Sequence, residues 1–271
     1  RATAINGTKR NKAFRRPLAI NKRKGRLQKS KTNYKDYAMS TQWYPHENAA
    51  ASAAALADAV AETLQDALDK KGQAVLAVSG GRSPIAFFDA LSQKDLDWQN
   101  IGITLVDERI VPTDHADSNT GLVREYLLKN KAAAAHWIPM VADGADEAAL
   151  ADSEKAVAFA LQHYRQPDAL VLGMGGDGHT ASLFPQAPQL DKGLGPAYAE
   201  PLLHTSPVTA PHERISMTLE AVAATPAVFL AIQGAEKKAV YEAAAAQASK
   251  TYPLSFVLNH KKVTCHVYYA N

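Results

Sequence analysis

A histidine on a glycine-rich turn is the residue of this sequence best suited to acid–base chemistry. The stretch GMGGDGHTASLFP spans residues 173–185 and directly follows the apolar run ALVL. Histidine is the side chain whose ordinary pKa, about 6.5, suits both accepting and donating a proton near neutral pH. We expect His179 to act as a general base supported by Asp177, while Gly175 and Gly176 let the backbone turn sharply and approach a ligand.

A second cluster, SGGRSP, follows the apolar run AVLAV and has the composition of an anion-binding turn. Gly80 and Gly81 permit close approach of the backbone, and the N-terminus of the helix expected next points N–H groups at an anion. Ser79, Arg82 and Ser83 add donors, so we expect a phosphate-binding turn. The segment matches neither GxxxxGK[ST] nor GxGxxG, and an ordinary strand-to-helix turn is the alternative interpretation.

A third cluster, VDERIVP, follows the run ITL. We expect Asp107 and Arg109 to contact the substrate, because a guanidinium can bind a phosphate or carboxylate in bidentate fashion. A surface salt bridge is the alternative interpretation. The polar loop that follows leads into a helix, and its residues Asp117, Ser118 and Asn119 either cap that helix or face the cavity.

These three clusters predict water attacking a phosphorylated substrate without a metal or a cofactor. The nine histidines include no HExxH pair and no tight pair with a carboxylate at metal-ligand spacing, and GxSxG is absent. We therefore predict no metal ligands. Five histidines are interpreted as solvated or structural: His46, His136, His163, His204 and His260.

Helix and strand signals alternate along most of the chain. The predicted helices cover 47–70, 84–91, 118–128, 146–165 and 235–247, with a short helix beginning at residue 179. The predicted strands cover 73–78, 101–107, 136–141, 167–176, 213–219, 226–234 and 262–269. Apolar strands alternating with helices predict an α/β fold, Rossmann-like, with a mostly parallel sheet and helices on both faces. In such a sheet the three clusters meet at the carboxyl ends of the strands.

Residues 1–38 differ in charge from residues 39–271. The first segment holds 13 lysines and arginines against one acidic residue, whereas the second holds 17 against 26. The first segment has few large apolar residues, so we predict a disordered basic leader followed by one enzyme domain. Three interpretations of the leader remain: a nucleic-acid-binding arm, a transit peptide, or non-native sequence before Met39. We favour the last and expect no nucleic-acid partner.

The single cysteine, Cys265, excludes an internal disulfide and lies in an alternating pattern typical of a buried strand. A lone thiol fits a reducing cytoplasm, which is the location we predict. No run of 18 apolar residues occurs, so no membrane partner is expected. We expect a monomer or a dimer.

The sequence resembles the 6-phosphogluconolactonase family, part of the superfamily that also contains glucosamine-6-phosphate isomerases. The resemblance rests on SGGRSP, DERIVP with DSNTG, GMGGDGHTASLFP and HERISMTL, and it covers residues 43–269. It implies hydrolysis of 6-phospho-D-glucono-1,5-lactone to 6-phosphogluconate, the second step of the oxidative pentose phosphate pathway. It also implies that His179 activates water with support from Asp177.

The resemblance carries further roles onto matching residues. Ser79, Gly80, Gly81 and Arg82 line the substrate turn. Arg109 binds the anionic part of the substrate or stabilises the oxyanion, and Arg214 binds phosphate. The sequence departs from the family in one place, because SPVTAPHER lacks the lysine that many members carry before this arginine. We expect His212 or Arg82 to supply the missing charge.

Two other functions remain as alternatives. A glucosamine-6-phosphate deaminase of the same fold is one, although such enzymes carry DEY for DER and IAFNEP for TASLFP. A sugar-phosphate sensor without turnover, with the leader as its nucleic-acid arm, is the other.

Overall fold

The computed structural model describes residues 41–271, so the leader predicted over residues 1–38 lies outside the described residues. The strands are β1 (Thr41–His46), β2 (Ala74–Val78), β3 (Ile101–Leu105), β4 (Asp107–Arg109), β5 (His136–Trp137), β6 (Ala169–Leu172), β7 (Leu202–Thr205), β8 (Arg214–Met217), β9 (Ala227–Gln233) and β10 (Cys265–Ala270). The helices are α1 (Ala49–Lys71), α2 (Ile85–Ser92), α3 (Asn119–Tyr126), α4 (Ser153–His163), α5 (Leu190–Leu194), α6 (Leu219–Ala223), α7 (Ala235–Ala246) and α8 (Leu254–Leu258), with 3₁₀ turns η2 (Trp98–Asn100) and η3 (Asn130–Ala134).

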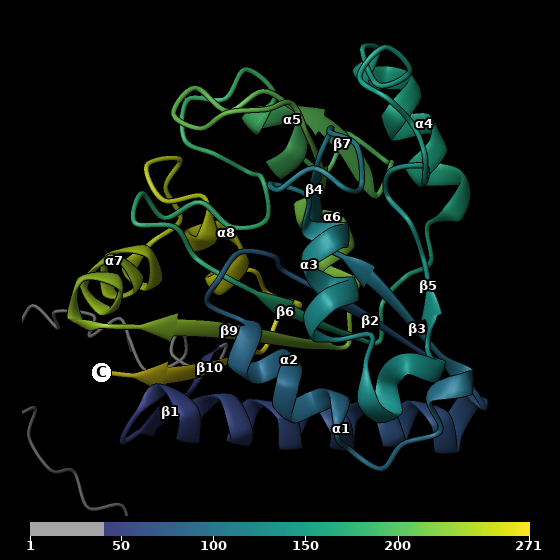
Figure 1. Ribbon diagram of the computed structural model, residues 1–271. Coiled ribbons are helices and arrows are strands. Elements are labelled where there is room, and N and C mark those ends of the chain that lie inside the picture. The colour runs from purple at the N-terminus through teal and green to yellow at the C-terminus, as the bar shows by residue number, and fades with distance from the viewer. Residues whose placement is uncertain (1–40) are drawn as a thin grey trace, which may run out of the picture. The chain divides into compact units, whose positions relative to one another are not determined.

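The described chain is built around a parallel sheet of seven strands in the order β1-β10-β9-β6-β2-β3-β5. Every neighbouring pair in this sheet is parallel. Figure 1 shows α1 and α2 on one side of the sheet and α7 and α8 on the other. The predicted α/β class, with a mostly parallel sheet covered on both faces, is confirmed.

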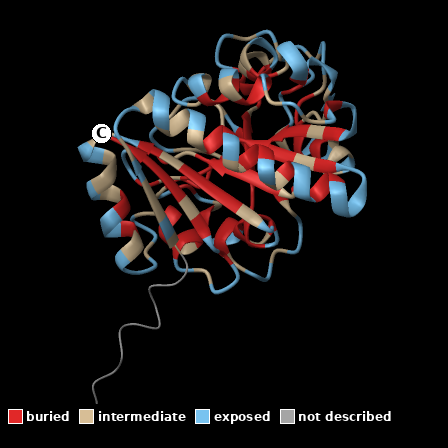
Figure 2. Cartoon of the chain, turned by 90° about the horizontal axis from the view of Figure 1, so that it is seen from below, coloured by how far each residue is buried: buried red, intermediate tan, exposed pale blue. Residues whose placement is uncertain are grey.

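Burial explains why the strands read as continuous apolar runs. All four residues of β6 are buried, and Figure 2 shows the strands as the buried layer between helices whose outer faces are exposed. A parallel sheet is covered on both faces, so strict alternation of polar and apolar residues is not needed. The same sheet buries Cys265 completely, as expected for a strand residue, and burial raises the pKa of its thiol to about 12.

Helix α1 shows how local sequence sets the bounds of an element. The side chain of Asn48 accepts a hydrogen bond from the N–H of Ala51 at 2.9 Å and so caps the first turn. Gly72 ends the helix in the left-handed conformation, with φ of 72°, where a side chain would be strained. Between these caps, Leu56, Val60 and Leu64 recur at a spacing of four and pack into the core.

The registers of neighbouring strands bring two of the predicted clusters together. Val78 pairs with Leu105 of β3 and Val171 of β6, so β2 ends between these strands. The N–H of Ser79 donates to the carbonyl of Val171, and the Ser79 hydroxyl accepts from the N–H of Gly173, both at 3.0 Å. The SGGRSP turn and the GMGGDGH turn are therefore joined directly.

Several predicted elements are corrected by the structure. The predicted strand over 213–219 lies in a separate antiparallel sheet of order β4-β8-β7, because the short strand β4 leaves the main sheet after Val106. The predicted helix over 146–165 starts only at Ser153, where Asp152 caps it. No helix begins at His179, since Ala181 has a positive φ of 47°, which a helix does not accommodate. β1 was not predicted.

No helix among residues 41–271 combines the length and the apolar character needed to cross a bilayer.

Candidate active site

The three predicted clusters line a cavity of about 330 Å³ at the carboxyl ends of the strands. An adjoining cavity shares three of its lining residues: Arg109, His179 and Arg214. The predicted residues in the first cavity are Ser79, Gly80, Gly81, Ser83, Asp107, Arg109, Gly175, His179 and Arg214, and those in the second include Gly176 and Asp177. Of all the predicted site residues, only Arg82 lines neither cavity, and its side chain is exposed.

His179 and Asp177, the predicted acid–base pair, are hydrogen-bonded to each other. Nδ1 of His179 lies 2.6 Å from Oδ1 of Asp177, and the same oxygen accepts from the backbone N–H of His179 at 3.2 Å. An ionised carboxylate can only accept, so Nδ1 carries the proton and Nε2 keeps a lone pair. The imidazole is 28 % exposed, which leaves it accessible to water and to a ligand.

Gly175 makes room for this imidazole. A Cβ at Gly175 would lie 2.2 Å from both Cε1 and Nδ1 of His179 and 2.6 Å from Oδ1 of Asp177. The N–H of Gly175 donates to the carbonyl of His179 at 3.0 Å, and this bond closes the turn. A glycine is thus required here by close approach, whereas a Cβ at Gly176 would meet nothing within 4 Å.

The aromatic ring of Phe184 contacts both the histidine and a buried arginine. The rings of His179 and Phe184 are stacked with centroids 3.9 Å apart, and the guanidinium of Arg214 lies 5.6 Å from the Phe184 centroid. Arg214 is 5 % exposed and donates to the carbonyl of Pro211. Burial, followed by the charge of the neighbouring Arg109, lowers the pKa of Arg214, yet a guanidinium stays protonated at neutral pH.

Arg109 has donors left over for a ligand. Its Nη1 donates to the backbone carbonyl of Asp117, but its buried Nε has no partner among the described residues. An unpaired buried donor is costly. The guanidinium lines both cavities and is a group suited to pair with an anion there.

Glu108 holds the loops of the site in place. Its buried carboxylate accepts from the N–H groups of Arg109, Asn119 and Thr120 and from the hydroxyls of Ser118 and Thr120. Burial raises the pKa of Glu108, and the donors that face it oppose the rise. This network fixes the start of α3, where Ser118 is the cap and Asn119 lines the first cavity.

Asp107 is tied to the opposite loop. Its Oδ2 accepts from the hydroxyl of Ser182 at 2.6 Å, and the N–H of Ser182 donates to the hydroxyl of Ser216. The loop that carries His179 is thereby bonded to both β4 and β8.

Lys237 is a cavity residue that the sequence analysis missed. It lies in the first turn of α7, directly after β9, and lines the cavity together with Ser79. It is partly buried, and burial lowers the pKa of its amine. The segment GAEKK, a glycine turn after an apolar strand, could have predicted this position. The carboxyl ends of all strands in a parallel sheet lie at the same edge, so a lysine just after such a strand lies near the site.

Of the two residues expected to replace the family's lysine, His212 lines the second cavity and Arg82 lines neither cavity. Arg82 is exposed, and Nε2 of His212 lies 2.8 Å from Oδ2 of Asp117. The expectation that one of them supplies the missing charge stays a prediction, and Lys237 is a lysine that lines the first of these two cavities.

Comparison with known proteins agrees with this geometry. A sequence model of the family described as glucosamine-6-phosphate isomerases/6-phosphogluconolactonase matches residues 47–266. The chain belongs to this family of sugar-phosphate enzymes.

Within the family, the similarity is to proteins named 6-phosphogluconolactonase. The chain is 67 % identical to one from Neisseria meningitidis over 228 residues, which cover 84 % of this chain and 98 % of that protein. It is 40 % identical to one from Helicobacter pylori over 233 residues, covering 86 % and 99 %. A crystal structure of a putative 6-phosphogluconolactonase from Neisseria gonorrhoeae superposes with a TM-score of 0.83 at 68 % identity, covering 84 % and 99 %.

A monomeric glucosamine-6-phosphate deaminase shares the fold alone, with 16 % identity and a TM-score of 0.67 over 85 % of this chain and 97 % of that one.

Proposed function

We propose that the protein hydrolyses 6-phospho-D-glucono-1,5-lactone to 6-phospho-D-gluconate, the second step of the oxidative pentose phosphate pathway, without a metal or a cofactor. The observation that carries the proposal is the His179–Asp177 pair, which opens onto cavities that Arg109 and Arg214 also line. The relatives named 6-phosphogluconolactonase support the choice of substrate.

The phosphate is anchored by the turn after β2 and by two cations. The N–H groups near Gly80 and Gly81 are suited to an anion, as in other glycine turns before a helix. Lys237 and Arg214 line the same cavity and supply positive charge from two further strand ends. Because Arg214 is buried and fixed by Pro211, it pays little ordering entropy when the phosphate binds.

Hydrolysis then proceeds by attack of water on the lactone carbonyl. Nε2 of His179 takes a proton as the water oxygen bonds to C1, and Asp177 stabilises the imidazolium that forms. Arg109 donates to the carbonyl oxygen as it becomes negative. The ring C1–O bond breaks and the imidazolium returns its proton to the ring oxygen, which becomes a hydroxyl group. The new carboxylic acid keeps the second proton of the water and releases it to solvent, which leaves the carboxylate.

A direct assay tests this proposal. The purified protein, freed of metal with EDTA, should hydrolyse 6-phosphogluconolactone faster than the spontaneous reaction and release no ammonia from glucosamine-6-phosphate. Ammonia release without lactone hydrolysis would establish the deaminase instead. Tight binding of a sugar phosphate without turnover would establish the sensor.

We also propose a cytoplasmic enzyme whose catalytic domain is residues 39–271, acting as a monomer or a dimer. A buried lone thiol is compatible with a reducing compartment. No nucleic-acid partner is proposed, because the proposed substrate is a small sugar phosphate and the proposed site is the cavity lined by residues of 49–270.

A further inference from the structure

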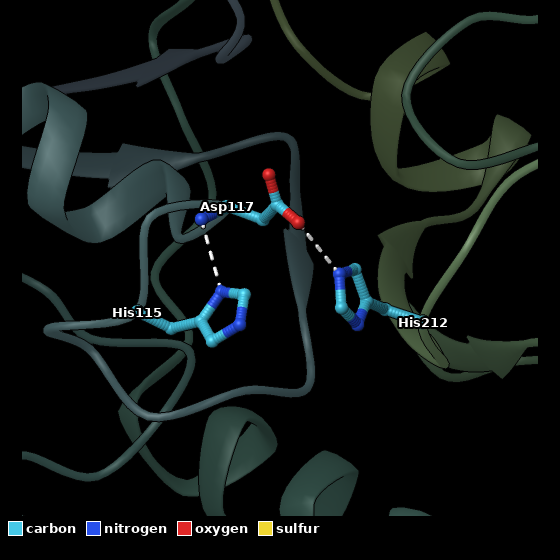
Figure 3. Close-up of side chains that lie close together, drawn as sticks. All are labelled: His115, Asp117 and His212. Atoms are coloured by element: carbon cyan, nitrogen blue, oxygen red, sulfur yellow. Dashed lines mark hydrogen bonds and ion pairs between the residues drawn. The ribbon is translucent and has the colours of Figure 1, made fainter.

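Two histidines and an aspartate from separate loops meet at the rim of the second cavity. They are His115 and Asp117, between β4 and α3, and His212, between β7 and β8 (Figure 3). One ligand atom from each residue lies within 4.8 Å of the other two, and residues 41–271 contain no second group of this kind. Asp117 and His212 are 95 positions apart in the chain, so the sequence offered no sign of the cluster.

We propose that His115, Asp117 and His212 form a reversible binding site for a divalent transition-metal ion, with Zn²⁺ as the best match, which links the two rim loops and takes no part in hydrolysis. Two imidazoles and a carboxylate are a ligand set that Zn²⁺ takes, with bonds of about 2.0–2.2 Å. A fourth position stays open to water.

The present geometry is close to what such a site requires. Bonds of that length in a tetrahedral site place neighbouring ligand atoms about 3.3 Å apart. Nε2 of His212 and Oδ2 of Asp117 are 2.8 Å apart, with a proton between them that the metal would replace. Nδ1 of His115 accepts from the N–H of Asp117 at 3.0 Å, and the rings of His115 and His212 have centroids 5.3 Å apart. The His115 ligand atom lies within 4.8 Å of the other two, so a shift of this side chain toward them is what the complete set requires.

His212 has an unusual backbone conformation, and its side chain and that of Asp117 are open to solvent. His212 has a φ of 68°, a left-handed conformation that non-glycine residues adopt rarely. Its side chain is 26 % exposed and that of Asp117 is 53 % exposed, so an ion can enter from solvent. Arg109, which donates to the Asp117 carbonyl, lowers the affinity for a cation, and this makes the binding reversible.

The site is separate from the reaction centre. His179 is not one of its ligands, and His115 lines neither cavity. Asp117 and His212 do line the second cavity, so an ion there would hold the loop before α3 to the loop before β8 beside the catalytic base.

Isothermal titration of the full, EDTA-treated chain with Zn²⁺ tests the proposal. We expect one equivalent to bind, and Co²⁺ to show the visible absorption of a four-coordinate ion. His115→Gln should weaken Zn²⁺ binding by more than about tenfold, a loss that even an outer-shell partner can cause. His136→Gln, an exposed histidine on β5, is the matched control and should bind like the wild type. Zn²⁺ should raise the melting temperature of the wild type and of His136→Gln, but not of His115→Gln.

Binding with unchanged affinity in His115→Gln, or no saturable binding to the wild type, overturns the site. Metal-free wild type and His115→Gln should both hydrolyse the lactone as fast as the untreated enzyme. A loss of activity in both would show that the metal site is not separate from the reaction. The binding results do not depend on turnover, so a failure of the proposed lactonase activity would be recognised independently.

Discussion

Oδ1 of Asp177 lies 2.6 Å from Nδ1 of His179, and this contact sets which imidazole nitrogen can act as a base. The carboxylate holds the proton on Nδ1, so the lone pair stays on Nε2. Both residues lie on one turn, two positions apart, and so move together.

Asp177→Asn should lower kcat by about 10²–10⁴-fold, because the amide NH₂ can donate to Nδ1 and so favours the proton on Nε2.

His179→Ala should lower kcat over a similar range, about 10²–10⁴-fold, by removing the base. Both variants should melt near the wild-type temperature, since neither residue is buried. His136→Ala serves as the control. Near-native turnover in His179→Ala would show that another group activates water.

Gly175→Ala should abolish most turnover, because the new Cβ would overlap the His179 ring and displace it. Gly176→Ala is the matched control on the same turn, and it should lose far less activity because its Cβ has open space. Steady-state kinetics of both variants, with near-UV circular dichroism as a check on folding, test this requirement. Equal losses in the two variants would point to general rigidity of the turn.

Arg109→Ala should lower kcat/KM by at least about tenfold, through loss of charge-assisted hydrogen bonds to the developing oxyanion. Arg109→Lys should recover only part of this loss, since a point charge cannot reproduce the planar fork. Steady-state kinetics with the lactone measure both effects. Full activity in Arg109→Ala would show that the arginine of the DER motif is structural and does not stabilise the oxyanion.

Lys237→Gln should raise KM more than it lowers kcat, because it removes a charge that binds the phosphate in the ground state and the transition state alike. Lys238→Gln is the control, since Lys238 pairs with Glu242 on the surface of α7 and lines neither cavity. Inhibition by inorganic phosphate should weaken in Lys237→Gln alone. An unchanged KM would exclude Lys237 from phosphate binding.

Stability should depend on pH through the bidentate pair of Arg124 and Asp143, whose atoms lie 2.7 and 2.8 Å apart. Hydrogen bonding to Arg124 lowers the pKa of Asp143 in the folded state. The unfolded chain then binds more protons, so this contribution is present above the unfolded pKa, about 3.9, and is lost as the pH falls through the folded value.

Arg124→Met should therefore lower the free energy of unfolding at pH 7 by at most about 1 kcal/mol, because the pair is partly exposed and screened by solvent. The difference between variant and wild type should shrink as the pH falls below 4. Urea unfolding at both pH values measures it, and a difference that grows in acid would contradict the assignment.

The sequence by itself determined the fold class and most of the cavity. Apolar runs between helices predict a parallel sheet, and motifs that follow β2, β3 and β6 must then meet at one edge, because parallel strands share a direction. Ser79, Arg109 and His179 are therefore expected together from the sequence, and all three line the first cavity. It depends only on local pattern and on chain direction, both of which a sequence records.

Contacts between distant segments were decided only by the tertiary structure. The antiparallel pairing of β4 with β8 put Arg109 opposite Arg214, and the cluster of Asp117 with His212 follows from the same meeting of loops. Whether Arg82 lines a cavity was likewise undecided by its spacing from the glycines. Such contacts depend on how the chain packs across separations of up to about a hundred residues, and a local pattern carries no record of that packing.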